Sequence, residues 1–343
     1  MGSLKYIFAF IPAIVFTSCL EPYYPNVDTK PVLCINSLIK SGESINVQVT
    51  HTWYYPDGEN IKDRSVDDAV ITIYANNVQV DTDYLPKEGD EIRIYVSSEK
   101  YGDAEAEVTV PKLTHIKDLS WNVGLISSYK PEEGLMMEGN FMFNLLINAT
   151  IEDENELPDF YSIDFKSFSP YEPLNPDDHK DSDYWEDKTL YYYPGYLKYD
   201  ADPIFFENIG DMESVLEAYP QGFNFFTDRK FSGSSYTLHL MFENGHYQVN
   251  SPEWEEELLN VGLVMTLNSV SKSYYDWENY HTQVEGGLLG DIMDWGFSDP
   301  IWAYSNVSTG AGVVCAQTSI SYVINLKDYF EKLLYDNPYK YPN

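Results

Sequence analysis

The sequence is poor in cysteine and in basic residues, and each shortage excludes a class of protein. Its 343 residues include 3 cysteines, too few for the framework of a small disulfide-stapled scaffold. Lys and Arg number 21 against 55 Asp and Glu, so the formal net charge is -34. A chain this acidic repels the phosphate backbone, and we therefore exclude nucleic acid as a partner.

Motifs of catalysis are also missing from the sequence. There is no G-x-S-x-G nucleophile elbow, no H-E-x-x-H zinc motif and no Walker loop. The 6 His residues are scattered, and no two of them are four residues apart. Glycoside hydrolysis needs two carboxylates at about 5–9.5 Å, but among 55 acidic residues the sequence selects no such pair. The sequence does not, by itself, indicate an enzyme.

What the sequence does contain is a strong β pattern. Apolar residues make up 43% of the chain, enough for a sizeable core, and 30 Tyr and 17 Phe favour β-sheet and aromatic surfaces. Between residues 31 and 111 apolar and polar residues alternate, and Asn76-Asn77 supplies a hairpin turn. We expect a small immunoglobulin-like β-sandwich over 31–111, with alternating runs at 45–50, 69–74, 92–96 and 104–110.

Residues 112–343 predict a second and larger unit. Its strands are longer, and its few helical segments are expected at 211–219, 271–282 and 325–335. The expected fold class is therefore mainly β, with an N-terminal immunoglobulin-like β-sandwich followed by a larger antiparallel β-domain with few short helices. Its expected strands are 141–151, 160–168, 236–242, 262–270 and 311–324.

The first residues have the pattern of an export signal. Lys5 precedes an apolar run, Tyr6 to Phe16, that is shorter than the about 20 residues of a membrane span. Thr17, Ser18 and Cys19 then resemble the lipobox of bacterial lipoproteins. The resemblance implies a signal peptide over 1–18, lipid on Cys19 and a lipidated tether over 19–30. Leu20, rather than Asp, favours delivery to the outer membrane. The alternative is an ordinary cleaved signal peptide in which Cys19 is incidental.

Several further motifs together resemble one family. The chain is similar to the Bacteroidota outer-membrane lipoproteins catalogued as domain of unknown function 4249. The resemblance implies an accessory role beside a TonB-dependent transporter: the capture or gating of a nutrient at the mouth of a β-barrel at the cell surface. No general activity is established for that family. The motifs are PVLCIN (31–36), VDDAVITIY (66–74), VPK (110–112), FTDRKFSGSSYTL, LNSVSKSYYDW (267–277) and FSDPIWAYSNVSTGAGVV (297–314).

The segment Ser169–Gly195 contains the two candidate ligand sites that the residues suggest. Its alternating acids offer oxygen ligands for calcium, although the EF-hand spacing is absent, and a solvated acidic loop is the alternative. Its aromatic residues predict a platform for a glycan or peptide, against a role in a core or interface. The calcium candidates are Asp177, Asp178, Asp181 and Asp183, and the platform candidates are Tyr184, Trp185, Tyr191, Tyr192 and Tyr193.

The sequence alone is compatible with three functions. The first is a non-enzymatic binding or accessory subunit for an outer-membrane transporter. The second is a surface glycan or peptide hydrolase that uses a carboxylate pair, and the third is an adhesin or envelope scaffold. Cys34 and Cys315 lie in apolar β-like runs and are expected to be buried free thiols, with a long-range disulfide as the alternative. Gly310 and Gly312 predict a bulge or a close backbone approach.

Overall fold

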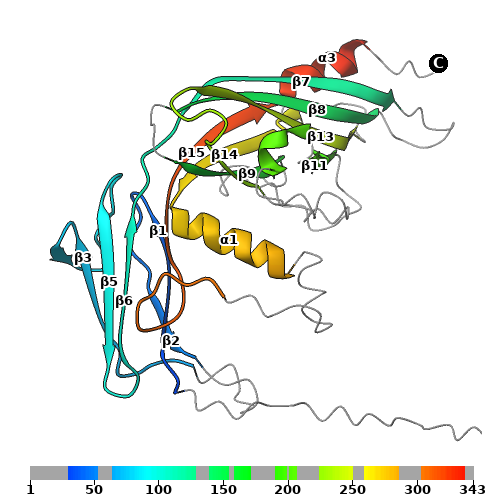
Figure 1. Ribbon diagram of the computed structural model, residues 1–343. Helices are drawn as coiled ribbons and strands as arrows, with labels where there is room; N and C mark the ends of the chain where they lie inside the picture. The colour runs from blue at the N-terminus through cyan, green and yellow to red at the C-terminus, as the bar shows by residue number, and fades with distance from the viewer. Residues whose placement is uncertain are drawn as a thin grey trace, which may run out of the picture.

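The chain is mainly β, as the sequence predicts, and it forms two lobes at an angle to each other (Figure 1). Three sheets and two α-helices make up the described part of the computed structural model. Three expected segments lie outside the described residues: the signal peptide, the tether up to residue 29 and the helix at 211–219. The structure describes residues 30–52, 64–128, 139–153, 158–170, 190–198, 201–206, 224–249, 259–285 and 303–336.

The N-terminal lobe is a sandwich of one complete sheet and part of a second. The complete sheet is antiparallel, in the order β4-β3-β5-β6. It packs against β1 and β2, which pair antiparallel at one end of a six-stranded sheet. The strands of this lobe are β1 (Leu33–Lys40), β2 (Gln48–His51), β3 (Val70–Ala75), β4 (Val78–Val80), β5 (Glu91–Ser98) and β6 (Gly102–Thr109).

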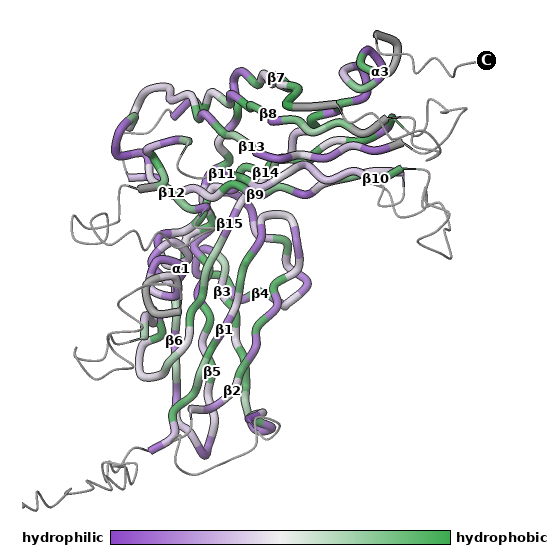
Figure 2. Tube along the Cα trace, turned by 90° about the vertical axis from the view of Figure 1, so that its right-hand side faces the viewer, coloured by the Kyte–Doolittle hydropathy of each residue, from purple (hydrophilic) through white to green (hydrophobic). Residues whose placement is uncertain are grey.

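The six-stranded sheet runs through both lobes in the order β12-β9-β14-β15-β1-β2. The start of β15 pairs parallel with β1, from Ser37 opposite Val314 to Lys40 opposite Gln317. The rest of β15 pairs antiparallel with β14 in the second lobe. One strand therefore joins the two lobes (Figure 2). The new strands are β9 (Phe160–Phe168), β12 (Phe225–Thr227), β14 (Gly262–Val270) and β15 (Val314–Asn325).

The C-terminal lobe packs a third sheet on the far half of this one. Its order is β10-β13-β8-β7, and β11 also pairs with β13. Helix α3 (Lys327–Asp336) follows β15 and places Phe330 in the core beside Phe143 and Tyr247. The remaining elements are β7 (Ile116–Ser128), β8 (Gly139–Glu152), β10 (Leu190–Tyr193), β11 (Tyr196–Lys198), β13 (Ser235–Val249) and the 3-10 helix η6 (Pro203–Phe206).

The predicted division at residue 111 needs a correction. Strand β6 does end close to Pro111, but the N-terminal lobe also contains residues 303–316 from the far end of the chain. Within that segment Ala311 donates a backbone hydrogen bond to Leu33, and Val307 and Val314 lie in the core of the N-terminal lobe. The alternation of apolar and polar residues predicts strands, but it does not indicate that residues 303–316 pack against the N-terminal lobe. The structure confirms the mainly β class and does not establish the immunoglobulin-like detail.

The glycines of the returning segment explain why it fits there. A Cβ atom at Gly312, whose φ is +103°, would lie 2.2 Å from the carbonyl oxygen of Ile35 on β1. A Cβ at Gly310 would lie 2.6 Å from the carbonyl oxygen of Leu33. The predicted close backbone approach is therefore confirmed, and it serves the packing of β15 against β1.

Candidate ligand-binding cleft

Helix α1 (Lys272–Glu285) lies in the angle between the two lobes (Figure 1), and its first turn is fastened to β15. The Ser271 hydroxyl accepts from the backbone N–H of Tyr274 at 3.3 Å and of Ala316 at 3.0 Å. The Ser273 hydroxyl donates to the carbonyl of Val314 at 2.9 Å. A serine N-cap thus fixes both the start of the helix and its position on the sheet.

A cleft of about 540 Å³ lies between α1 and the β1–β2 pair. Its size is within the range of about 300–1,000 Å³ that small-ligand sites occupy. One wall comes from β1, β2 and the residues before β2, the opposite wall from α1, and the floor from the region where β15 begins. The lining residues are Asn36, Ser37, Leu38, Asn46, Gln48, Tyr274, Trp277, Glu278, Val313 and Cys315.

The strand wall presents side-chain amides. Asn36 and Gln48 are opposite each other in the β1–β2 register and so share a face of the pair. The Asn36 amide is engaged, because its Oδ1 accepts from the Val313 N–H at 3.1 Å. Asn46 and Gln48 are exposed, and their side-chain amides make no hydrogen bond to another described residue. Two amides therefore remain available to a ligand.

The helix wall presents two aromatic rings. Tyr274 packs edge-on against Phe225 at a centroid distance of 5.3 Å, and burial raises the pKa of its hydroxyl to about 12. Trp277 stacks on His281, one turn further along the helix, at 5.2 Å. These contacts hold both rings in place while leaving them half-buried at the cleft. The wall is therefore a preformed aromatic surface.

Glu278 places a carboxyl group beside these rings. Its partial burial raises its pKa, the charge of Asp164 acts in the same direction, and His281 acts against both. Asp164 is itself held by the side-chain amides of Asn224 and Asn268, each at 2.7 Å. Glu278 makes no hydrogen bond to any described residue, so its oxygens are also available to a ligand.

Cys315 in the floor of the cleft is not a nucleophile. Burial raises the pKa of its thiol to about 12, which keeps it protonated near neutral pH. In the parallel register Cys315 is opposite Leu38, four residues along β1 from Cys34, a separation of roughly 13 Å. A disulfide needs Cα atoms within about 7 Å. Both cysteines are free, as predicted, and the disulfide alternative is wrong; Cys315 is also buried as predicted, whereas Cys34 is only half-buried.

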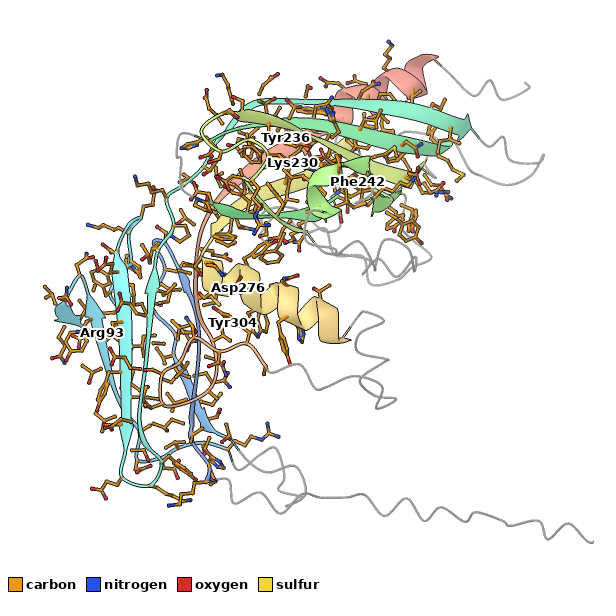
Figure 3. All side chains as sticks on the ribbon, viewed as in Figure 1. Arg93, Lys230, Tyr236, Phe242, Asp276 and Tyr304 are labelled. Atoms are coloured by element: carbon orange, nitrogen blue, oxygen red, sulfur yellow. The ribbon has the colours of Figure 1, made fainter. Side chains whose placement is uncertain are left out.

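The other face of α1 meets the returning segment. Figure 3 shows Asp276 of α1 and Tyr304 of that segment on facing elements in the angle between the lobes. Burial raises the pKa of Tyr304 to about 12, and the charge of Asp276 acts in the same direction. The helix is thus fastened to β15 at its start, which fixes the position of the aromatic wall, and Asp276 on its other face lies near enough to Tyr304 for their charges to interact.

The predicted aromatic platform is divided by the structure. Tyr191 and Tyr193 lie on the outer face of β10, where Tyr191 contacts His246 and Tyr193 contacts Tyr196. Tyr192 points to the opposite face and packs on the core of the C-terminal lobe, so it is not a platform residue. Alternation along a strand requires this division. Tyr184 and Trp185 lie outside the described residues.

The calcium prediction falls on Asp177, Asp178, Asp181 and Asp183, which also lie outside the described residues. Across the part of the chain that the structure describes, no group of three or more His, Cys, Asp or Glu side chains is gathered to hold a metal ion. No helix in that part is long and apolar enough to cross a membrane.

The cleft is the feature that sequence analysis missed. Its helix wall belongs to the motif LNSVSKSYYDW, whose aromatic residues were the available signal, but its strand wall lies more than 200 positions earlier in the chain. Comparisons of this chain with protein-family models, with curated proteins and with solved structures find no match. The cleft itself is therefore the feature that bears on function.

Proposed function

We propose that this protein is an outer-membrane lipoprotein that acts as a non-enzymatic binding subunit, an accessory to a TonB-dependent nutrient transporter at the cell surface. The observation that supports binding is the preformed cleft between α1 and the β1–β2 pair. It combines two fixed aromatic rings with amide and carboxyl groups that have no hydrogen-bond partner among the described residues. Such a combination of apolar surface and convergent polar groups is typical of ligand sites.

The direction of β1 supports the role of the lipid. Strand β1 runs parallel to β15, which leads into the C-terminal lobe, so its first residue lies at the end of the N-terminal lobe away from the C-terminal lobe (Figure 1). Lipid on Cys19 would hold that end at the membrane. The N-terminal lobe would then act as a stalk, and the cleft would be presented at a distance from the bilayer to a neighbouring barrel.

The test is affinity purification of the C-terminally tagged protein from detergent-solubilised outer membranes, with Cys19→Ala as the control. We expect a TonB-dependent barrel in stoichiometric amount with the wild-type protein and its loss with the variant. Wild-type protein that emerges alone would contradict the accessory role. If it emerges alone yet still fractionates with the outer membrane, the scaffold or adhesin hypothesis gains.

One observation favours a hydrolase as the second candidate. Glu278 is a carboxyl of raised pKa in a cleft, and the charge of Asp164 contributes to that shift. Glycosidases use a carboxyl group of raised pKa together with a second carboxyl group. Release of reducing ends from a neutral polysaccharide, lost in Glu278→Gln, would establish this activity. Binding without release of reducing ends would exclude it for that polysaccharide.

A further inference from the structure

We propose that the cleft binds one ring of a neutral saccharide, which lies between the aromatic wall of α1 and the amide wall of β1 and β2. This inference rests on the proposed binding function and names its ligand class. The two walls offer different chemistry, and a pyranose ring needs both: a surface for its C–H face and hydrogen-bonding groups for its hydroxyls.

The aromatic wall supplies the first requirement. The faces of aromatic rings carry partial negative charge and attract the weakly positive C–H groups of a sugar. Trp277 is held by its stack on His281, and Tyr274 by its contact with Phe225. Their centroids are 6.3 Å apart and their planes are inclined by 34°. Because both rings are already positioned, little side-chain entropy is lost when a ligand binds.

The amide wall supplies the second requirement. Each side-chain amide has two N–H donors and one carbonyl acceptor, so it can bind two adjacent hydroxyls at once. Asn46 lies just before β2 and Gln48 is its first residue, and both side chains are exposed and line the cleft. Glu278 adds two acceptor oxygens from the opposite wall. Hydroxyl groups, which both donate and accept, match this set.

Charge excludes anionic ligands from the cleft. No Lys or Arg is among the described residues that line it, whereas Glu278 is. The chain as a whole has a net charge of -34, which repels anions at longer range. Uronic acids, phosphates and peptide carboxylates therefore have no counterion here. A quaternary ammonium group would suit the rings and Glu278, but it would use neither the donors nor the acceptors of the Asn46 and Gln48 amides.

The test is calorimetric titration of the full-length lipoprotein in detergent with neutral hexasaccharides. The panel contains the β-1,4-glucose, β-1,4-xylose, β-1,4-mannose, α-1,4-glucose and β-1,3-glucose hexamers. Oligogalacturonate, choline and a neutral tetrapeptide serve as competing ligand classes. We expect at least one neutral hexamer to bind and the oligogalacturonate not to bind. No binding by any of the five hexamers, or binding of only a competing class, would overturn the proposal.

Matched variants tie that binding to the cleft. Trp277→Ala should weaken the hexamer by about tenfold or more, while Trp121→Ala, which removes a 40% exposed Trp from β7, should leave it unchanged. Gln48→Ala should weaken binding, and Gln79→Ala on β4 should not. Equal loss in both members of a pair, or loss in neither, would contradict the site. Unchanged thermal unfolding is required of each variant.

Glu278→Gln separates a sugar from a cation. The amide keeps an acceptor and removes the charge, so a neutral hexamer should lose only a fewfold in affinity, whereas a cation should lose its binding. The outcome is also independent of the accessory role. A hexamer that binds while no barrel co-purifies supports this inference and contradicts the transporter proposal. A barrel that co-purifies while no hexamer binds supports the transporter proposal and contradicts this inference.

Discussion

The two lobes are both β-sandwiches, but their cores are built from different side chains. The buried core of the N-terminal lobe, as described, consists of Leu, Ile, Val and Ala. The core of the C-terminal lobe contains nine Phe and Tyr residues in its fully or nearly buried set. Those residues are Phe141, Phe143, Tyr161, Phe205, Phe226, Phe231, Phe242, Tyr247 and Phe330.

Aliphatic and aromatic cores differ in the polar atoms that they bury. Aliphatic side chains fill a thin sandwich without bringing in polar atoms. Tyrosines fill more volume but take hydroxyls inside, and those of Tyr192 and Tyr247 have no hydrogen-bond partner in the described structure. Burial raises the pKa of both. We therefore expect substitutions in the C-terminal core to have larger effects, of either sign, than substitutions in the N-terminal core.

The largest expected effect is that of Phe143→Ala. Phe143 is fully buried and packs edge-on against Phe330 at 5.3 Å, so its removal leaves a large cavity and should cost about 3–5 kcal/mol of unfolding free energy. The counterpart in the N-terminal core is Ile94→Val, expected to cost about 0.5–1.5 kcal/mol. Urea denaturation of both variants measures the difference. Equal losses of unfolding free energy in the two variants would contradict the expectation that substitutions in the C-terminal core have the larger effects.

Gly312→Ala tests how the returning segment closes the N-terminal lobe. An alanine at this position would keep the positive φ, and its methyl group would clash with the Ile35 carbonyl. We therefore expect the variant to lose about 2–3 kcal/mol of unfolding free energy. Gly42 has a φ of +79° with nothing within 4 Å, so Gly42→Ala reports the backbone cost alone, about 1 kcal/mol. Equal losses in thermal unfolding would mean that the close approach to β1 contributes nothing.

A buried carboxyl group in the C-terminal lobe predicts that its neutralisation will stabilise the fold. Asp228 is 1% exposed, and neither carboxylate oxygen has a hydrogen bond of good geometry, although the backbone of Asp159 and the side chain of Ser232 lie near enough to oppose the rise of its pKa. Burial raises its pKa, and the charges of Asp153 and Asp159 act in the same direction. Because the folded-state pKa is raised, ionisation destabilises the fold above the ordinary carboxyl pKa. Asp228→Asn should therefore stabilise by on the order of 1 kcal/mol at pH 7.

The pH series provides the check on that gain. The stabilisation by Asp228→Asn should shrink as the pH falls through the folded-state pKa, and it should vanish below the ordinary carboxyl value, where both states are protonated. Urea midpoints of both proteins, measured from pH 7 down to the acid transition, give the curve. A gain independent of pH would show that charge is not its cause.

The smallest expected effects come from two tyrosine hydroxyls. Tyr247→Phe in the C-terminal core removes a hydroxyl without a partner and should be neutral or slightly stabilising. Tyr84→Phe in the N-terminal lobe removes a donor to Asp90 at 2.8 Å and should cost about 1 kcal/mol. Thermal unfolding of the two variants is the measurement. A loss in Tyr247→Phe equal to that in Tyr84→Phe would point to an unseen partner of Tyr247.

Most strands were predictable because their signal is local. The expected strands 160–168 and 262–270 coincide with β9 and β14, and the expected helix at 271–282 coincides with most of α1. The same rule of alternation also implies that Tyr191 and Tyr192 face opposite sides of their strand, although composition alone grouped them as one platform. Strand β7 was missed, since its sequence mixes polar and apolar residues at the edge of a sheet.

The sequence by itself determined the mainly β class, the strong negative charge, the positions of the longer strands and the close approach at Gly312. Each of these depends on composition, on alternation or on one residue and its neighbours. Only the tertiary structure decided that residues 303–316 complete the first lobe and that Gln48 and Trp277 line the same cleft. Both depend on pairing β1 with a strand almost 280 positions later. Local periodicity carries no information about such a partner, because many strands of similar pattern compete for the same edge.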